Sequence, residues 1–166
     1  MFIFAELKQR DMKKEFMQLA IDIAVESVKE LQGGPFGAII VKDGKVIAKT
    51  SNSVTTTNDP TAHAEINAIR EACQHLNTFD LSGSEIYSSC EPCPMCLSAI
   101  YWAKIDKIYY AADRYDAEKI GFNDSLIYTE LSLPENQRSI PSINIMKEEG
   151  QEPFNLWQKT ESKIEY

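Results

Sequence analysis

At residues 61–65 the chain reads Thr-Ala-His-Ala-Glu, and at residues 90–96 it reads Cys-Glu-Pro-Cys-Pro-Met-Cys. The first stretch supplies His63 with a carboxylate two residues later. The second supplies Cys93 and Cys96 within a Pro-Cys-x-x-Cys pattern. One imidazole and two thiolates are ligands of the kind that zinc prefers. Three protein ligands leave the fourth tetrahedral position open, which is typical of a catalytic and not a structural zinc site.

The two prolines of the second stretch predict how its cysteines are presented. Pro92 keeps the residue before it extended, so the chain should reach Cys93 as a strand or loop. Pro94 suits the first position of a helix, where its missing N–H costs nothing. Cys93 is therefore expected at the helix N-cap, with Cys96 one turn further on. The partial positive charge of a helix N-terminus favours the thiolates that a metal needs.

His63 is expected at the start of another helix, because it follows Pro60. Residues two apart on a regular helix face nearly opposite ways. His63 and Glu65 can therefore share a site only if the helix begins between them. Glu65 would then be a carboxylate beside an activated water, and it could hold a proton between two steps of a reaction.

A closed structural zinc site, completed by Cys90, is the competing interpretation. Residues 90–93 are expected to be extended, a reach of roughly 10 Å, whereas thiolates on one zinc lie within about 4 Å of each other. The closed site also gives Glu65 no role. We therefore favour the catalytic interpretation and expect one zinc ion per subunit.

The composition is that of an acidic globular protein. The chain has 166 residues, of which 43% are hydrophobic and 25% charged, and it has no low-complexity run; this predicts one domain with a full core. The net charge of −8 disfavours a nucleic-acid partner, because affinity for a phosphate backbone rests largely on Lys and Arg.

Three of the four cysteines lie too close together for an ordinary disulfide framework, which indicates a reducing, cytoplasmic compartment. The apolar residues 1–5 are too few for a signal peptide, and no stretch approaches a membrane span.

Hydrophobic periodicity and turn residues predict an α/β fold. We expect helices at 13–31, 62–76, 94–103 and 154–163, strands at 37–41, 45–49, 85–89, 107–111 and 144–147, loops at 51–60 and 134–142, and mixed helix and loop at 113–128. This order predicts a three-layer αβα sandwich around a central mixed sheet of five strands. The first two strands flank Asp43-Gly44, a strong hairpin signal, and the later strands should be parallel. Both helix starts that carry zinc ligands would lie at one edge of the sheet, where open α/β sheets bind ligands.

Four longer segments carry a family resemblance: GGPFGAIIVKDG at 33–44, NDPTAHAEINAIREAC at 58–73, YSSCEPCPMCLSAIYWA at 87–103 and AADRYDAEKIGFNDSLIY at 111–128. With them the sequence closely resembles the cytidine-deaminase-like superfamily and, within it, the bacterial guanine deaminases. The resemblance runs from about Phe16 to Tyr166. The H-x-E and P-C-x-x-C motifs are the superfamily's signature. They do not determine which nucleobase is the substrate. The segment from Asp116 to Tyr128 and the terminal Tyr166 are the features that resemble guanine deaminases.

This resemblance implies hydrolysis of guanine to xanthine and ammonia, in purine catabolism or salvage, by a homodimer with a cytidine deaminase-like fold. It implies a small nucleobase as partner, and neither nucleic acid nor a membrane. The alternatives are a cytosine deaminase, a tRNA adenosine deaminase and, with least support, a zinc-stabilised interaction module. A tRNA enzyme would require a basic face and salt-sensitive RNA binding. The interaction module would require a fourth protein ligand and would leave Glu65 without a role.

The resemblance also implies roles for residues around the zinc ligands His63, Cys93 and Cys96. Glu65 is implied as the proton shuttle and Asp116 as the acid that recognises guanine, with a further role in proton transfer. Substrate contacts are implied for Phe36, Asn52, Trp102 and Tyr166. Each has an ordinary structural alternative: Asn52 could be a turn residue, Phe36 and Trp102 could be core residues, and Asp116 could be a helix cap.

The domain organisation expected from the sequence is one deaminase domain over residues 1–166. Residues 1–12 are expected to be an N-terminal extension, and Met12 could be an alternative start. Residues 154–166 are expected to form a helix and tail that closes the active site, with Tyr166 at the pocket mouth. Chain ends are usually frayed unless they are tied down, so the alternative is a solvated tail.

Overall fold

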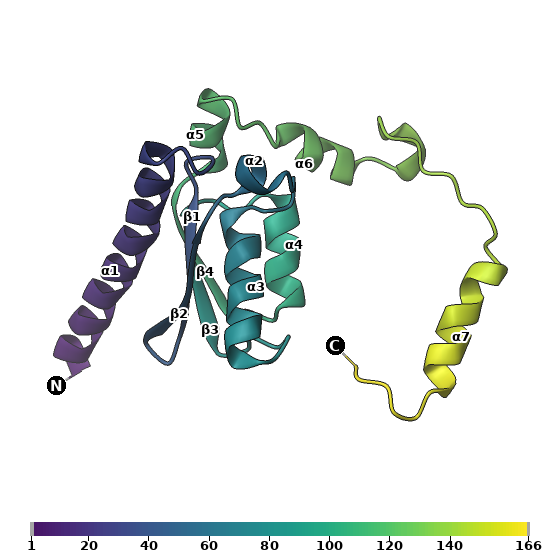
Figure 1. The fold of residues 1–166 in the computed structure, drawn as a ribbon, viewed down its shortest axis with the longest axis horizontal. Helices are drawn as coiled ribbons and strands as arrows, with labels where there is room; N and C mark the ends of the chain where they lie inside the picture. The colour runs from purple at the N-terminus through teal and green to yellow at the C-terminus, as the bar shows by residue number, and fades with distance from the viewer. Residues whose placement is uncertain (1, 166) are drawn as a thin grey trace. The chain divides into compact units, whose positions relative to one another are not determined.

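The computed structural model describes residues 2–165, with side chains from Arg10 onward. The chain divides into two compact units, Met1–Asp124 and Ser125–Tyr166, and each is described by itself. The first unit contains, in order, α1 (Phe2–Lys29), β1 (Gly37–Lys42), β2 (Lys45–Ser51), α2 (Val54–Thr57), α3 (Ala64–Leu76), β3 (Ser84–Cys90), α4 (Pro94–Trp102), β4 (Lys107–Ala112) and α5 (Arg114–Lys119) (Figure 1).

The sheet of the first unit has the strand order β2-β1-β3-β4. Strand β1 is antiparallel to both β2 and β3, and β3 is parallel to β4. The turn between β1 and β2 places Asp43 and Gly44 at φ +51° and +72°, the backbone that a tight two-residue hairpin requires. The mixed sheet, the hairpin and the parallel pair are as expected from the sequence.

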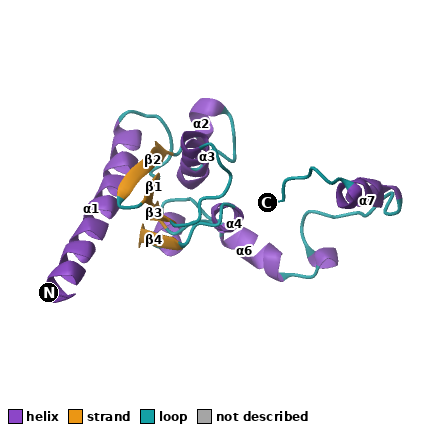
Figure 2. Ribbon diagram, turned by 90° about the horizontal axis from the view of Figure 1, so that it is seen from below, coloured by secondary structure: helices purple, strands orange, loops and turns teal. Residues whose placement is uncertain are grey.

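Helices cover both faces of this sheet, and its central strands β1 and β3 are buried on both sides. Ile39 and Ile40 are both fully buried, yet they lie in different core clusters, since successive strand residues point to opposite faces. Ile39 packs with Ala20 of α1. Ile40 packs with the small alanines of α3 and with Ile100 of α4. Helix α1 therefore covers one face and helices α3 and α4 the other, so the three-layer αβα prediction is confirmed (Figures 1 and 2).

Residues 2–165 form a sheet of four strands, and the prediction of five was wrong. The expected fifth strand at 144–147 belongs to the second unit, which contains α6 (Ser125–Ser132), η1 (Glu135–Gln137), η2 (Glu149–Gln151) and α7 (Glu152–Lys159). Residues 144–146 have no regular structure, and Ile143 and Ile145 are 81% and 77% exposed. Alternating apolar residues form a strand only where a neighbouring edge pairs with them, and no described segment pairs with 144–147.

Two smaller expectations also change. The expected loop at 51–60 contains the short helix α2, whose Thr56 and Thr57 hydroxyls donate to the carbonyl of Ser53. The helix expected over 13–31 begins earlier, because α1 starts at Phe2; the N-terminal extension over residues 1–12 stays a prediction. No helix within the described residues is long and apolar enough to cross a membrane. A single deaminase domain over residues 1–166 stays a prediction.

Candidate metal centre

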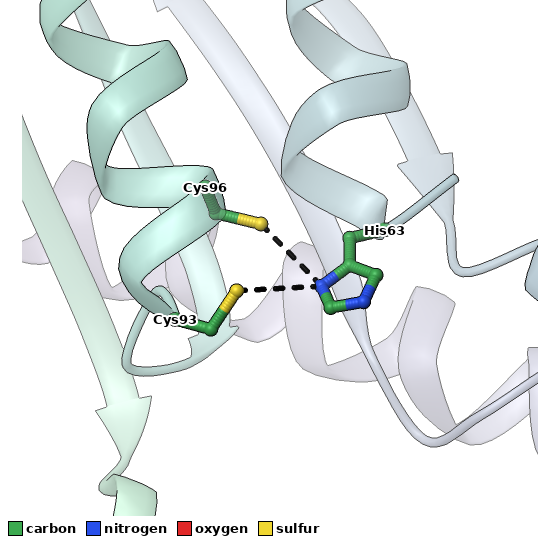
Figure 3. Close-up of side chains that lie close together, drawn as sticks. All are labelled: His63, Cys93 and Cys96. Carbon is green, nitrogen blue, oxygen red and sulfur yellow. Dashed lines mark hydrogen bonds between the residues drawn. The ribbon is translucent and has the colours of Figure 1, made fainter. Parts of the chain in front are cut away.

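Helices α3 and α4 each begin immediately after a predicted zinc ligand. His63 is the N-cap of α3, with φ −67° and ψ 155°, and Cys93 is the N-cap of α4, with φ −64° and ψ 168°. Pro94 occupies the first turn of α4, as expected, and Cys96 is buried one turn along it. Neither His63 nor Cys93 makes a side-chain capping hydrogen bond. Instead, the imidazole and both thiols point toward one another (Figure 3).

The spacing of these three side chains fits a tetrahedral zinc ion. His63 Nδ1 lies 3.6 Å from Cys93 Sγ and 3.5 Å from Cys96 Sγ, and the three ligand atoms all lie within 4.8 Å of one another. Zinc–ligand bonds of about 2.0–2.3 Å at tetrahedral angles place nitrogen and sulfur roughly 3.5 Å apart. The donor set and the geometry therefore both suit zinc.

Cys90 is outside this ligand group. It ends strand β3, and its Sγ donates to the backbone oxygen of Asp113 over 3.6 Å. Burial raises the pKa of the Cys90 thiol to about 11. Within the ligand group, hydrogen bonding by Cys96, together with His63, lowers the pKa of Cys93 to about 4, and hydrogen bonding to Cys93 raises the pKa of Cys96. The described side chains thus form a site with three ligands and not a closed one with four.

Glu65 lies beside the ligands without belonging to the group. Helix α3 starts at Ala64, so His63 precedes the helix and Glu65 can reach the same side, as the sequence required. Its side chain is buried; Oε1 accepts from Ser88 Oγ over 3.0 Å and Oε2 accepts from Cys96 Sγ over 3.4 Å. Burial raises the pKa of Glu65. A carboxylate in this environment is suited to taking up and returning a proton.

Ser88 is a residue of this site that sequence reasoning missed. It is fully buried on β3 and donates to Glu65, which lies 23 positions earlier in the chain. A polar residue within a strand buried on both faces was the available signal, because buried hydroxyls need partners. Which partner it has depends on how α3 packs on β3.

Asp124 is the second missed residue. It is half-buried, and burial, followed by the negative charge of Cys93, raises its pKa. The pKa of His63 is raised chiefly by hydrogen bonding to Cys93 and, to a smaller extent, by the charges of Glu65 and Asp124. A carboxylate with a raised pKa beside a metal-ligand cluster is a candidate functional residue. No sequence spacing links Asp124 to the motifs.

Asn52 is buried and held in one orientation. Among the described residues its side chain makes hydrogen bonds through Oδ1 alone, which accepts from the backbone N–H of Gly34 over 3.3 Å and of Val54 over 3.2 Å. A Cβ at Gly33 would lie 2.1 Å from the Asn52 carbonyl oxygen, so this close approach requires glycine. The side-chain oxygen of Asn52 thus stabilises the local backbone and the Nδ2 group is left as a donor; a contact of Asn52 with a substrate stays a prediction.

Phe36 and Trp102 differ in their surroundings. Phe36 is half-buried, packs against the core cluster beneath α3 and meets Phe122 edge to face, with 4.9 Å between ring centroids. Trp102 ends helix α4 and is 68% exposed, so it is not a core residue of this unit. Contacts of either residue with a substrate stay predictions.

Asp116 lies at the surface. It forms a capping box with Asp113, in which Asp113 Oδ1 accepts from the Asp116 N–H and Asp116 Oδ2 accepts from the Asp113 N–H. Its Oδ1 also accepts from Lys119 Nζ over 2.8 Å, and this hydrogen bond lowers the pKa of Asp116. The helix-cap interpretation is thus correct, and a role in guanine recognition stays a prediction. Tyr166 lies outside the described residues.

Comparison with known proteins finds matches over most of the chain. Residues 10–112 match the family described as the cytidine and deoxycytidylate deaminase zinc-binding region. The chain is 50% identical over 151 residues to a guanine deaminase of Bacillus subtilis (strain 168), which covers 91% of this chain and 97% of that relative. It is 45% identical over 100 residues to a tRNA-specific adenosine deaminase of Aquifex aeolicus, covering 60% of this chain and 66% of the relative.

The chain is also similar in structure to solved guanine deaminases. The X-ray structure of guanine deaminase from Bacillus subtilis superposes with a TM-score of 0.90 at 49% identity, over 92% of this chain and 98% of that one. A structure of guanine deaminase from Nitrosomonas europaea gives a TM-score of 0.63 at 32% identity, over 73% of this chain and 66% of that one.

Proposed function

Because this chain belongs to the cytidine and deoxycytidylate deaminase zinc-binding family, we propose that it converts guanine and water into xanthine and ammonia. The observation that carries the proposal is the open three-ligand cluster with the buried Glu65 carboxylate beside it. Guanine is favoured as the substrate because the similarity to a guanine deaminase spans 97% of that relative, whereas the similarity to a tRNA-specific adenosine deaminase ends after 100 residues.

The chemistry divides between the metal and one side chain. Zinc held by His63, Cys93 and Cys96 supplies the Lewis acidity that makes water a nucleophile at neutral pH. Glu65 accepts the proton of the attacking water and delivers it to a ring nitrogen as C2 becomes tetrahedral. Glu65 then takes the remaining proton from the new C2 hydroxyl and transfers it to the amino group, so that the C–N bond breaks, ammonia leaves and the C2 carbonyl of xanthine forms.

The surroundings of Glu65 support this shuttle. Ser88 donates to one oxygen of the carboxylate, so its orientation is fixed before a substrate binds. Burial raises the pKa of Glu65, which brings its proton affinity closer to that of the groups with which it exchanges protons. A carboxylate that holds a proton between two steps needs both properties.

Base recognition is assigned to side chains around this centre. Asn52 Nδ2 would donate to a carbonyl oxygen of the base, and the Phe36 and Phe122 pair would form an apolar wall. A carboxylate would accept from guanine N–H groups. The family resemblance favours Asp116 for that role, but the burial of Asp124 and its electrostatic interaction with Cys93 make Asp124 our preferred residue. A site built around such hydrogen bonds rejects bases that lack the matching groups.

The family resemblance also supports a homodimer acting in purine catabolism or salvage, with a free nucleobase and not a nucleic acid as its partner. The net charge of −8 disfavours a phosphate backbone. Free thiol ligands suit a reducing, cytoplasmic compartment.

Ammonia release from a panel of substrates tests the proposed function. The zinc-loaded protein is incubated with guanine, cytosine, adenine, cytidine and tRNA, and Glu65→Gln serves as the inactive control. We expect guanine to give by far the highest kcat/KM, with xanthine as the product. Preferential turnover of cytosine or tRNA would overturn the substrate assignment, and no turnover of any of them would overturn the deaminase assignment.

A further inference from the structure

The side-chain amide of Asn67 joins two backbone carbonyls and a serine hydroxyl near the metal centre. Asn67 lies on α3, four residues after His63. Its Nδ2 donates to the carbonyl of Ser51 over 3.0 Å and to the hydroxyl of Ser53 over 3.0 Å, and it lies 3.4 Å from the carbonyl of Ala62. The backbone N–H of Asn67 donates to the carbonyl of His63 over 2.9 Å, so Asn67 lies in the first turn of α3, which begins at the ligand.

The partners of Asn67 belong to the two segments that deliver site residues. Ser51 and Ser53 flank Asn52, and Ala62 immediately precedes His63. The two segments are also joined directly, because the Ser53 N–H donates to the Ala62 carbonyl over 3.0 Å. Asn67 therefore holds together both ends of the loop that separates Asn52 from His63.

The chemistry of this junction requires a donor with more than one hydrogen. Two of the three partner atoms are carbonyl oxygens, which only accept hydrogen bonds. A primary amide supplies two N–H groups, so it can satisfy both serine partners at once. An aspartate at the same position would have the same shape but would place a carboxylate against these acceptors.

We propose that Asn67 is a positioning residue that fixes the base-contacting Asn52 relative to the metal ligand His63. The inference rests on the proposed function, which gives Asn52 its contact with the base. Asn67 itself contacts neither the base nor the metal. Small displacements of reacting groups have large effects, since a misplacement of about 1 Å can cost about 10²-fold in rate. Loss of a group that orients a metal ligand typically lowers metal affinity by about 10- to 100-fold.

The test compares Asn67→Ala and Asn67→Asp with a matched control on the same helix. Asn77 is the C-cap of α3 and adopts the left-handed conformation at φ +50°. Asn77→Ala therefore strains the far end of α3 and lowers stability without touching the site. For each protein the experiment measures Tm, zinc affinity by competition with a chelator, and kcat and KM for guanine.

We expect Asn67→Ala to bind zinc about tenfold more weakly and to lose roughly 10- to 100-fold in kcat/KM, mainly through a higher KM. Asn67→Asp should be more impaired, because it replaces the donor with an acceptor, and its similar shape tests the proposal should Asn67→Ala fail to fold. Asn77→Ala should lower Tm and keep wild-type zinc affinity and kinetics. Wild-type zinc affinity and KM in both Asn67 variants would overturn the proposal.

A double-mutant cycle with Asn52→Ala isolates the positioning effect. If Asn67 acts through Asn52, the double variant should bind guanine about as weakly as Asn52→Ala alone, whereas independent residues give additive losses. Additive losses in KM would overturn the link to Asn52. Failure of the wild-type protein to deaminate guanine would refute the proposed function instead, and the zinc-affinity comparison would still decide whether Asn67 orients His63.

Discussion

Replacing Ser88 by alanine removes the hydroxyl that orients the Glu65 carboxylate. The Ser88 Oγ to Glu65 Oε1 distance is 3.0 Å, and the two residues are only 1% and 6% exposed. A hydrogen bond to a charged group contributes roughly 1.5–3 kcal/mol, and about 1.4 kcal/mol corresponds to tenfold in rate. We therefore expect kcat/KM for guanine to fall by roughly 10- to 100-fold. The loss should stay below that of removing the shuttle itself, because the Glu65 carboxylate remains in the site.

Ser84 provides the matched control for this variant. It lies four residues earlier on β3 and is fully buried, so it points to the same face of the sheet as Ser88. Its hydroxyl has no hydrogen-bond partner among the described residues. Ser84→Ala should therefore keep wild-type activity and should not lower Tm, because an unpaired buried hydroxyl contributes no stability.

The assay measures steady-state guanine deamination, zinc content and Tm for both serine variants. Ser88→Ala should keep stoichiometric zinc and lose several degrees of Tm as well as activity, because one oxygen of a buried carboxylate loses its donor. Equal kcat/KM in the Ser88→Ala and Ser84→Ala proteins would refute the argument that Ser88 positions the shuttle.

Cys96→Ala should lose zinc and activity and should melt at a lower temperature, because the ion ties the starts of two helices together; stoichiometric zinc in the purified variant would contradict the ligand assignment. Glu65→Gln should keep its zinc while kcat falls roughly 10²–10⁴-fold, and loss of metal would instead make Glu65 a ligand. Asp124→Asn should lower kcat/KM for guanine more than Asp116→Ala, which should mainly lower Tm by removing the capping box; the opposite ranking of guanine kinetics would return the recognition role to Asp116. Deleting residues 163–166 should lower kcat/KM with zinc content and Tm unchanged if the C-terminal segment closes the site, and unchanged kinetics would show that it does not.

The metal ligands could be predicted from sequence because local rules place them. Pro94 starts helix α4, which puts Cys93 at its N-cap and Cys96 one turn later. The same reasoning placed His63 and Glu65 at the start of α3, and the structure confirms that start. Each of these placements depends on backbone preferences within a few residues.

Long-range packing explains what could not be predicted. The hydrogen bond from Ser88 to Glu65 links a strand to a helix, and no local rule specifies how those elements are aligned. Asp124 is brought near the ligands in the same way. Conversely, Asp113 and Asp116 have capping-box spacing, so the structural role of Asp116 could be predicted from the sequence, and the structure shows that capping box. The expected strand at 144–147 failed because local alternation cannot supply a pairing edge.

The starts of α3 and α4 impose a trade-off between the stability of the metal-free protein and its chemistry. Ser, Thr, Asp or Asn at an N-cap stabilises a helix by roughly 0.5–2 kcal/mol relative to alanine, yet the caps here are His63 and Cys93, and neither makes that hydrogen bond. Selection for folding alone would favour replacing both. Zinc restores the missing stabilisation only when it is bound, so the fraction of this protein that is folded should depend on the free zinc concentration around it.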